Sequence, residues 1–287
     1  MNAGTPMWLY ALIFLFMAVA GVIFYGVFRW KTETKAMRAK LHAVRVPLPS
    51  ETLQTQDLDS LPEPVQRFFR AALPQNPALI AAARITQTGT FNTGTKWSPF
   101  TANQLVITNR PGFDWDARIA MAPGANAFVH DSYIDGIGIL HVEAMGLIPL
   151  MDMRGTPEMA QGELQRFFAE AAWYPTRLLP SYGVEWEAID SRSAAATMRD
   201  GDNSATLSFH FNADGLIEKV RADARYRVVD GVTSATPWEG RFWDYELRAG
   251  MQIPMDGEVY WLLPSGPGPY WRGRITSVEY EFEKTSE

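Results

Sequence analysis

The sequence predicts an α+β fold: a large curved antiparallel sheet with helices packed on one face, preceded by one N-terminal transmembrane helix. Three observations support this prediction. An uncharged apolar run opens the chain, apolar and polar residues alternate over two long stretches, and a helical pattern separates those stretches. No strand–helix–strand alternation of the parallel kind occurs, which favours antiparallel pairing. A twisted sheet of about ten strands tends to curl, so we expect a barrel or half-barrel.

The apolar run extends from Trp8 to Phe28 and contains neither a charge nor a proline. A helix needs roughly 20 apolar residues to cross the hydrocarbon core of a bilayer. Tryptophan and tyrosine lie near both ends of the run, as is usual at membrane interfaces. A cleaved signal peptide would need a basic region before the run and a small-residue cleavage site after it. The sequence has neither at these places, so we interpret the run as an uncleaved anchor.

Basic residues follow the anchor. Six lysines and arginines lie between Arg29 and Arg45, where Glu33 is the one acid. Such residues favour the cytoplasmic side, which predicts a single-pass inner (plasma) membrane protein with a cytoplasmic domain. They are also suited to contact anionic lipid headgroups. We expect three parts: an anchor over residues 1–30, a basic juxtamembrane helix and linker over 31–60, and one α+β half-barrel domain over 61–287.

Two shorter helices are expected within the domain. An apolar stripe at helical spacing predicts an amphipathic helix over residues 63–73. Thr156, followed by proline and glutamate, is typical of a helix N-terminus and predicts a helix that continues to about Trp173. Strands are expected from about Arg84 to Leu150 and again after Val184, with glycine and proline at the turns between them.

Composition excludes several classes of function. The absence of cysteine excludes disulfides, thiolate catalysis and cysteine-based zinc or iron–sulfur sites. Outside the basic segment the chain is acidic, and acidic surfaces repel phosphate backbones, so no nucleic-acid partner is expected. The four histidines lack the local spacing of metal ligands. No phosphate-binding glycine loop, dinucleotide fingerprint or Gly-x-Ser-x-Gly motif is present, so we predict neither a metal nor a cofactor.

Several motifs carry a resemblance to known families. Ser204–Ile217 forms a strand that ends in an Asp-Gly turn, and Trp243–Pro254 has the pattern Tyr…Gly…Ile-Pro. In these stretches the second half resembles the lipoprotein-carrier-like (LolA/LppX-like) fold. Over nearly its whole length the chain also resembles an uncharacterised bacterial family of membrane-anchored domains of unknown function, through the motifs Pro64–Phe68, Pro111–Trp115, Glu163–Phe167, Glu170–Pro175 and Trp238–Gly240. The first resemblance implies an acyl chain or similar apolar ligand held between a curved sheet and helices. It also implies a periplasmic or extracellular domain, opposite to the charge bias.

Polar and aromatic residues gather on the predicted central helix. Glu163, Arg166 and Glu170 are spaced i, i+3 and i+7, so they share one face, and Phe167 and Trp173 flank them. A guanidinium between two carboxylates is suited to bind a polar headgroup, and the two glutamates are the candidates for a catalytic acid and base. The alternative is a salt-bridged helix surface of little energetic value. Large aromatic neighbours favour the mouth of an apolar pocket.

Further ligand-binding candidates lie on the strands. The alternation of side chains along a strand shows which residues share a face of the sheet, but it does not show which face is concave. The alternative for each is an exterior, solvated position. The first strand set supplies Trp115, Arg118 and Tyr133, with Asp131 near them. The second supplies Arg241 and Tyr245, with Arg225 and Trp238 near them.

Three functional hypotheses follow. The first is a membrane-tethered binding protein for an apolar or amphipathic ligand such as a lipid, which requires space between the sheet and its helices. The second is a hydrolase that uses Glu163 and Glu170, which requires both carboxyls to face one cleft. The third is a structural or assembly partner in an envelope complex, which requires a large exposed apolar patch and no internal pocket.

Overall fold

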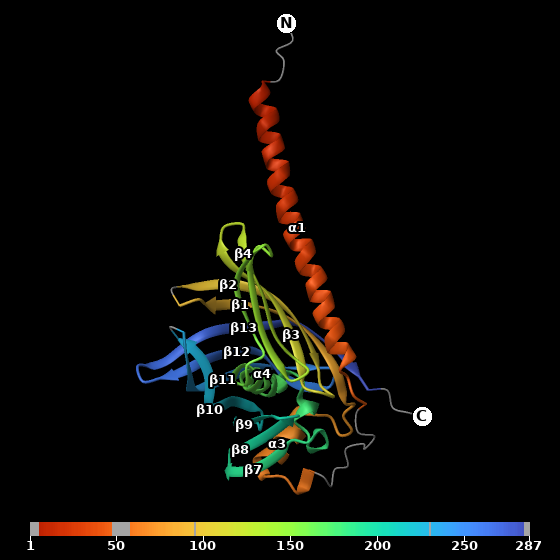
Figure 1. The fold of residues 1–287 in the computed structure, drawn as a ribbon. Helices are drawn as coiled ribbons and strands as arrows, with labels where there is room; N and C mark the ends of the chain where they lie inside the picture. The colour runs from red at the N-terminus through yellow and green to blue at the C-terminus, as the bar shows by residue number, and fades with distance from the viewer. Residues whose placement is uncertain (1–5, 48–57, 95, 230, 284–287) are drawn as a thin grey trace.

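The computed structural model describes residues 6–47, 58–94, 96–229 and 231–283. Its main feature is one antiparallel sheet of 13 strands that curves around a helix (Figure 1). This arrangement confirms the predicted fold class. Much of the linker that we expect before residue 61 lies outside the described residues.

The sheet consists of two meanders joined through its first and last strands. The strand order is β6-β5-β4-β3-β2-β1-β13-β12-β11-β10-β9-β8-β7. β1 pairs with both β2 and β13, so the two halves of the chain meet in the middle of the sheet. β6 and β7 are the two edges, which makes the sheet a half-barrel. The strands are β1 (Ile80–Asn92), β2 (Trp97–Ile107), β3 (Gly112–Ala122), β4 (Ala125–Ile134), β5 (Ile137–Ala144), β6 (Ile148–Arg154), β7 (Glu185–Asp190), β8 (Ser193–Asp200), β9 (Asn203–Phe211), β10 (Ile217–Val229), β11 (Val232–Arg248), β12 (Met251–Leu263) and β13 (Gly266–Phe282).

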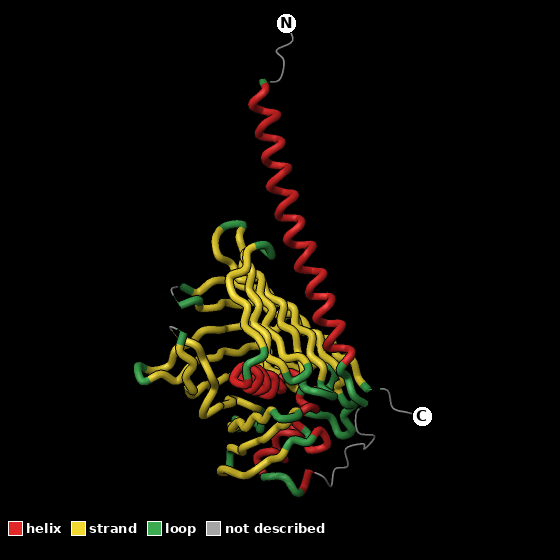
Figure 2. Tube along the Cα trace, viewed as in Figure 1, coloured by secondary structure: helices red, strands yellow, loops and turns green. Residues whose placement is uncertain are grey.

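The segment between β6 and β7 crosses the concave face of the sheet. It begins with α4 (Pro157–Ala169) and continues through three 3-10 turns, η1 (Glu170–Trp173), η2 (Pro175–Leu178) and η3 (Pro180–Tyr182). Figure 2 shows the helix in the hollow of the sheet. Phe167 and Phe168 of α4 are fully buried in the main core. α4 and η1 together occupy the range in which we expect one helix.

Thr156 caps the N-terminus of α4. Its Oγ1 accepts a hydrogen bond from the Met159 N–H at 3.2 Å. We expect Thr156→Ala to lower the free energy of unfolding by about 1 kcal/mol, measured by urea titration of the full chain in detergent. Thr156→Ser keeps the hydroxyl and should stay near wild type. An equal loss in both variants would contradict the capping role.

α3 (Glu63–Ala72) is the amphipathic helix that the apolar stripe predicts. Val65, Phe68 and Phe69 are buried and pack into the same core as α4. The ring of Phe68 lies 5.6 Å from that of Phe211 on β9. Both short helices therefore cover the concave face.

α1 (Met7–Ala43) is one continuous helix that combines the expected anchor with the expected juxtamembrane helix. By length and composition it is the one helix in the described ranges able to cross a membrane. Its first half projects away from the sheet, and its second half lies along the convex face, opposite α4 (Figure 1). Burial begins at Gly26 and continues through Trp30, Met37 and Leu41.

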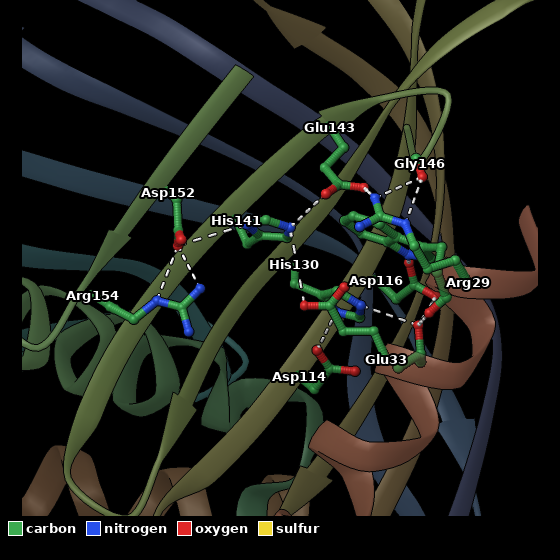
Figure 3. Close-up of polar contacts among 12 residues, drawn as sticks. Arg29, Glu33, Asp114, Asp116, His130, His141, Glu143, Gly146, Asp152 and Arg154 are labelled. Atoms are coloured by element: carbon green, nitrogen blue, oxygen red, sulfur yellow. Dashed lines mark hydrogen bonds and ion pairs between the residues drawn. The ribbon is translucent and has the colours of Figure 1, made fainter. Parts of the chain in front are cut away.

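A buried carboxylate holds α1 against the convex face. Asp114 on β3 accepts hydrogen bonds from Arg38 Nε of α1 and from Ser132 Oγ, both at 2.9 Å. Its Oδ1 also lies 2.7 Å from Nδ1 of His130 (Figure 3). Burial raises the pKa of Asp114, but His130 and Arg38 outweigh that effect and leave the pKa below its usual value. The charged form of Asp114 is therefore part of the helix–sheet contact.

Half of the basic juxtamembrane residues have partners within the protein. We expected them to contact lipid headgroups, but three of the six pair with carboxylates of the sheet. These pairs are Arg29 with Glu143, Arg38 with Asp114, and Arg45 with Glu281. The sequence does not reveal such partners because each is distant along the chain. The positive charge after the anchor therefore has a structural role in docking α1.

Candidate functional site

A cavity lies between α4 and the concave face of the sheet. Its volume is about 220 Å³, and its lining is mostly apolar. Core side chains fill much of the remaining space between the helices and the sheet. Five of the chain's ten tryptophans line the cavity: Trp115, Trp173, Trp238, Trp261 and Trp271.

Three glycines lie side by side on neighbouring strands, and two of them, Gly273 and Gly257, make room for the ring of Trp271. Gly273 on β13 pairs with Gly89 on β1 and with Gly257 on β12. A Cβ at Gly273 would lie 2.3 Å from the ring of Trp271, so the indole reaches this position only because the strand has no side chain there. The ring of Trp271 then lies 6.2 Å from that of Trp173 across the cavity.

Arg166 of α4 forms the polar side of the cavity. Its Nε donates to Glu170 Oε1 at 2.8 Å, and its Nη1 donates to Asp131 on β4. The guanidinium carbon lies 5.1 Å from the ring centroid of Trp115. Burial lowers the pKa of Arg166, but the carboxylates of Glu170, Asp131 and Glu163 more than offset it, and the pKa is raised. Arg166 is therefore a permanent cation in the cavity wall.

A chain of hydrogen bonds connects this ion pair to an aromatic wall. Glu170 Oε2 accepts from Gln104 Nε2 at 2.6 Å, and Gln104 Oε1 accepts from Gln87 Nε2 at 3.3 Å. Gln87 Oε1 in turn accepts from Trp115 Nε1 at 2.7 Å. The rotamers of these buried side chains depend on one another, which favours a preformed cavity over one that closes around a ligand.

Glu163 occupies a different environment from Glu170. Its Oε1 lies 3.5 Å from Arg225 Nη2, and its Oε2 is buried without a hydrogen-bond partner among the described residues. Burial, together with the nearby Asp131 carboxylate, raises the pKa of Glu163 to about 8. The raised pKa favours the protonated form of Glu163, which can donate a hydrogen bond.

Glu163 lines a second cavity of about 340 Å³, next to the first. Asp131 and Arg225 line both cavities, so these two residues form the boundary between them. The second cavity is rich in flexible apolar side chains from β5, β6 and α4: Leu140, Met151, Met153 and Met159. Methionine adapts to irregular apolar shapes, which suits a variable ligand.

The predicted ligand-binding residues are divided between these cavities and other places. The first cavity is lined by Trp115, Arg166, Glu170, Trp173 and Arg241, and the second by Glu163. The guanidinium of Arg241 itself lies 5.0 Å from the ring of Tyr260. Arg241 therefore contributes to the cavity rim and not to its charge network.

Four predicted residues do not line either cavity. Arg118 lies on the convex face, where its guanidinium carbon is 5.4 Å from the ring of Trp30 on α1. Phe167 points into the main core. Tyr133 is buried and Tyr245 is half-buried, and each donates a hydrogen bond from its hydroxyl to a partner within the domain. For the three strand residues, alternation did not distinguish these positions because it does not identify the concave face.

Sequence reasoning missed the cavity residues of the β12–β13 hairpin. Trp261 pairs directly with Trp238 on β11, and Trp238 Nε1 donates to the Tyr270 hydroxyl at 2.8 Å. A signal was present, because a Gly- and Pro-rich turn places Trp261 and Tyr270 near matching positions of one hairpin. Their rings are stacked with centroids 5.6 Å apart.

Glu163 and Glu170 do not face a common cleft. Glu163 lines the second cavity and Glu170 the first, and each has an arginine partner. The hydrolase hypothesis required the two carboxyls to converge on one substrate, and this geometry does not provide that arrangement.

These features define a class of protein: a helix-filled half-barrel of antiparallel strands with two adjacent cavities that share Asp131 and Arg225 in their linings. The chain belongs to a family of unknown function, DUF6920, whose model matches residues 59–280. The match begins after α1 and covers the whole sheet as far as Tyr280. The predicted resemblance to a family of unknown function is confirmed. No curated protein matches the chain.

Solved structures of similar shape include three bacterial proteins. A LolA superfamily protein from Nitrosomonas europaea is 12% identical, with a TM-score of 0.38, and the match covers 81% of this chain and 96% of that one. A domain described as an outer membrane lipoprotein-sorting protein from Vibrio parahaemolyticus is 10% identical, with a TM-score of 0.40 and coverage of 79% and 92%. A DUF1329 family protein from Desulfovibrio piger is 13% identical, with a TM-score of 0.36 and coverage of 70% and 86%. At these TM-scores the likeness supports no statement about a ligand.

Proposed function

We propose that this chain is a membrane-anchored binding protein that holds an apolar or amphipathic ligand, such as a lipid, between its sheet and α4. The observation that carries the proposal is the tryptophan-lined cavity with a buried charge network at its side. Ligand sites are typically concave, mostly apolar and provided with a few fixed polar groups. The cavity has each of these properties.

The apolar wall supplies the binding energy. Burying a methylene group contributes about 0.8 kcal/mol, so an acyl segment of roughly ten carbons gains about 8 kcal/mol before the entropic cost of association. Two of the rings that would contact it, those of Trp115 and Trp238, are held in place by hydrogen bonds of their indole N–H groups. Little conformational entropy is then lost on binding.

The polar groups select an amphipathic ligand over a plain hydrocarbon. The indole N–H of Trp173, which lines the first cavity, is buried without a hydrogen-bond partner in the described part of the chain. A buried donor without a partner costs about 1–3 kcal/mol, and a ligand carbonyl would remove that cost. Glu163 in the second cavity supplies a protonated donor, and Arg225 supplies a cation at the boundary of the two cavities.

The anchor is retained in this proposal. Residues on both sides of Phe28 belong to one helix, and Trp30 and Leu41 beyond it are fully buried against the convex face. Removal of the apolar half by a signal peptidase would cut a helix whose continuation is part of the domain. A permanent anchor keeps the cavity close to a membrane source of ligand.

A cavity-filling variant tests the proposal. Val259 lines the first cavity, and we expect Val259→Trp to reduce copurified lipid at least several-fold, because the new ring occupies the ligand volume. The measurement is mass spectrometry of organic extracts from the full chain purified in mild detergent. Val232→Trp is the matched control, because Val232 is 65% exposed on the same sheet. The proposal fails if wild type carries no lipid, or if a folded Val259→Trp protein carries as much as the control.

A further inference from the structure

Two neighbouring hairpin turns carry no charged residue. These are the β3–β4 turn, within residues 119–129, and the β5–β6 turn, within residues 144–151. Met121, Ile148 and Leu150 expose between 42% and 62% of their surface there. The adjacent β1–β2 turn contains one lysine, one asparagine and two threonines within residues 92–96, as expected for a turn in water. The two apolar turns thus differ from a neighbour at the same end of the sheet.

The apolar half of α1 touches the β5–β6 turn. A Cβ on Gly26 would lie 2.6 Å from both the Met145 carbonyl oxygen and Leu147 Cγ, so glycine allows the helix and turn to meet. Three residues later, Arg29 Nη2 donates to the Gly146 carbonyl oxygen at 2.8 Å (Figure 3). Figure 1 shows that the turns around β4 reach further along α1 toward the N-terminus than the rest of the sheet.

The contact between α1 and the β5–β6 turn sets how deep this turn lies in a bilayer that α1 spans. A helix rises about 1.5 Å per residue, so Trp8 to Phe28 spans about 30 Å, the thickness of the hydrocarbon core. Gly26 then lies about 3 Å inside the end of that core. When α1 crosses a bilayer, the β5–β6 turn at Gly26 lies at the boundary between acyl chains and headgroups.

We infer that residues 119–129 and 144–151 form an apolar tip that inserts into the lipid interface beside α1, an inference that rests on the anchor in the proposed function. Exposed apolar surface gains about 25 cal/mol per Å² when it leaves water, so Met121, Ile148 and Leu150 favour this position. Because the tip is attached to a membrane-spanning helix, the partner that covers these apolar side chains is the lipid surface.

The tip also brings the second cavity to the membrane. β6 begins at Ile148 in the tip, and the same strand lines the cavity with Met151 and Met153. β6 is an edge strand, and no strand of the described residues pairs with its outer side. A lipid that leaves the bilayer at the tip therefore meets the cavity wall without first crossing water.

Lipid quenching of site-specific labels tests this inference. The chain has no cysteine, so single cysteines can be labelled with a fluorophore in the full-length protein reconstituted in phosphatidylcholine vesicles. Leu150→Cys on β6 and Ile189→Cys on β7 are matched, because both side chains are 51% exposed on opposite edges of one sheet. A label at Phe16→Cys shows whether the apolar half of α1 lies within the bilayer. The quencher is a lipid with bromine on its acyl chain.

We expect labels at Phe16 and Leu150 to be quenched several-fold more than the label at Ile189. A quenched Phe16 label with Leu150 no more quenched than Ile189 would overturn the inference and leave the anchor intact. An unquenched Phe16 label would overturn the anchor and the inference together. If Leu150→Cys does not fold, Met121→Cys reports on the other turn of the tip, with the same outcomes.

Discussion

Trp30→Ala should destabilise the full chain by about 3–5 kcal/mol, the usual cost of truncating a buried tryptophan. Trp30 has no exposed surface, although it lies only two residues after the apolar run. Its indole N–H donates to Asp116 Oδ1 at 2.8 Å, and its ring stacks on His130 with centroids 4.5 Å apart. Alanine removes these contacts and leaves a gap between α1 and the convex face. Urea titration in detergent measures the loss.

Two further variants show how much of this destabilisation comes from the hydrogen bond and how much from the burial of the ring. Trp30→Phe keeps a ring but loses the hydrogen bond to Asp116, and should cost less than Trp30→Ala. Trp243→Ala on β11 removes a tryptophan that is 47% exposed, and should cost under about 1 kcal/mol. If Trp30→Ala were no more destabilising than Trp243→Ala, α1 would not be part of the folded domain.

Glu163 should make the chain less stable as the pH rises from about 5 to about 8. An unfolded glutamate has its usual pKa of 4.5, whereas burial raises the pKa of Glu163 to about 8 in the folded chain. Below the lower value both states hold the proton, and stability does not depend on this group. Between the two values only the folded state holds it, so the free energy of unfolding falls by about 1.4 kcal/mol per pH unit. Above the higher value the loss is complete.

Glu163→Gln tests this pH dependence because glutamine has a similar shape and stays neutral. The stability of wild type relative to Glu163→Gln should fall steadily over urea titrations at pH 5, 6, 7 and 8. Glu187→Gln, at an exposed position on β7, is the control and should follow the wild-type profile. A Glu163→Gln protein with the wild-type slope would show that another group causes the pH dependence.

The sequence alone could predict those elements whose defining residues lie close together along the chain. The stripe of α3 and the cap of α4 lie within a few residues of the positions they control. The pairing of β1 with β13 joins opposite ends of the domain, and alternation within each strand carries no information about such partners. The half-barrel was therefore predictable as a class, but the strand order was not.

The same distinction applies to the site. Glu163, Arg166 and Glu170 were identified because helical spacing places them on one face. The docking contact was not identified, because Asp114 looks like an ordinary polar position on an alternating strand. It is buried only because α1 covers the convex face. When a helix that is distant in sequence covers the polar face of a strand, the alternation of residues along the strand does not show that this face is buried.

The position of β13 constrains how the domain is made. A ribosome produces this strand after the other twelve, yet it lies in the centre and bridges the two meanders. Until it emerges, β1 and β12 each expose an unsatisfied row of backbone donors and acceptors. The nascent half-barrel therefore remains split through most of translation.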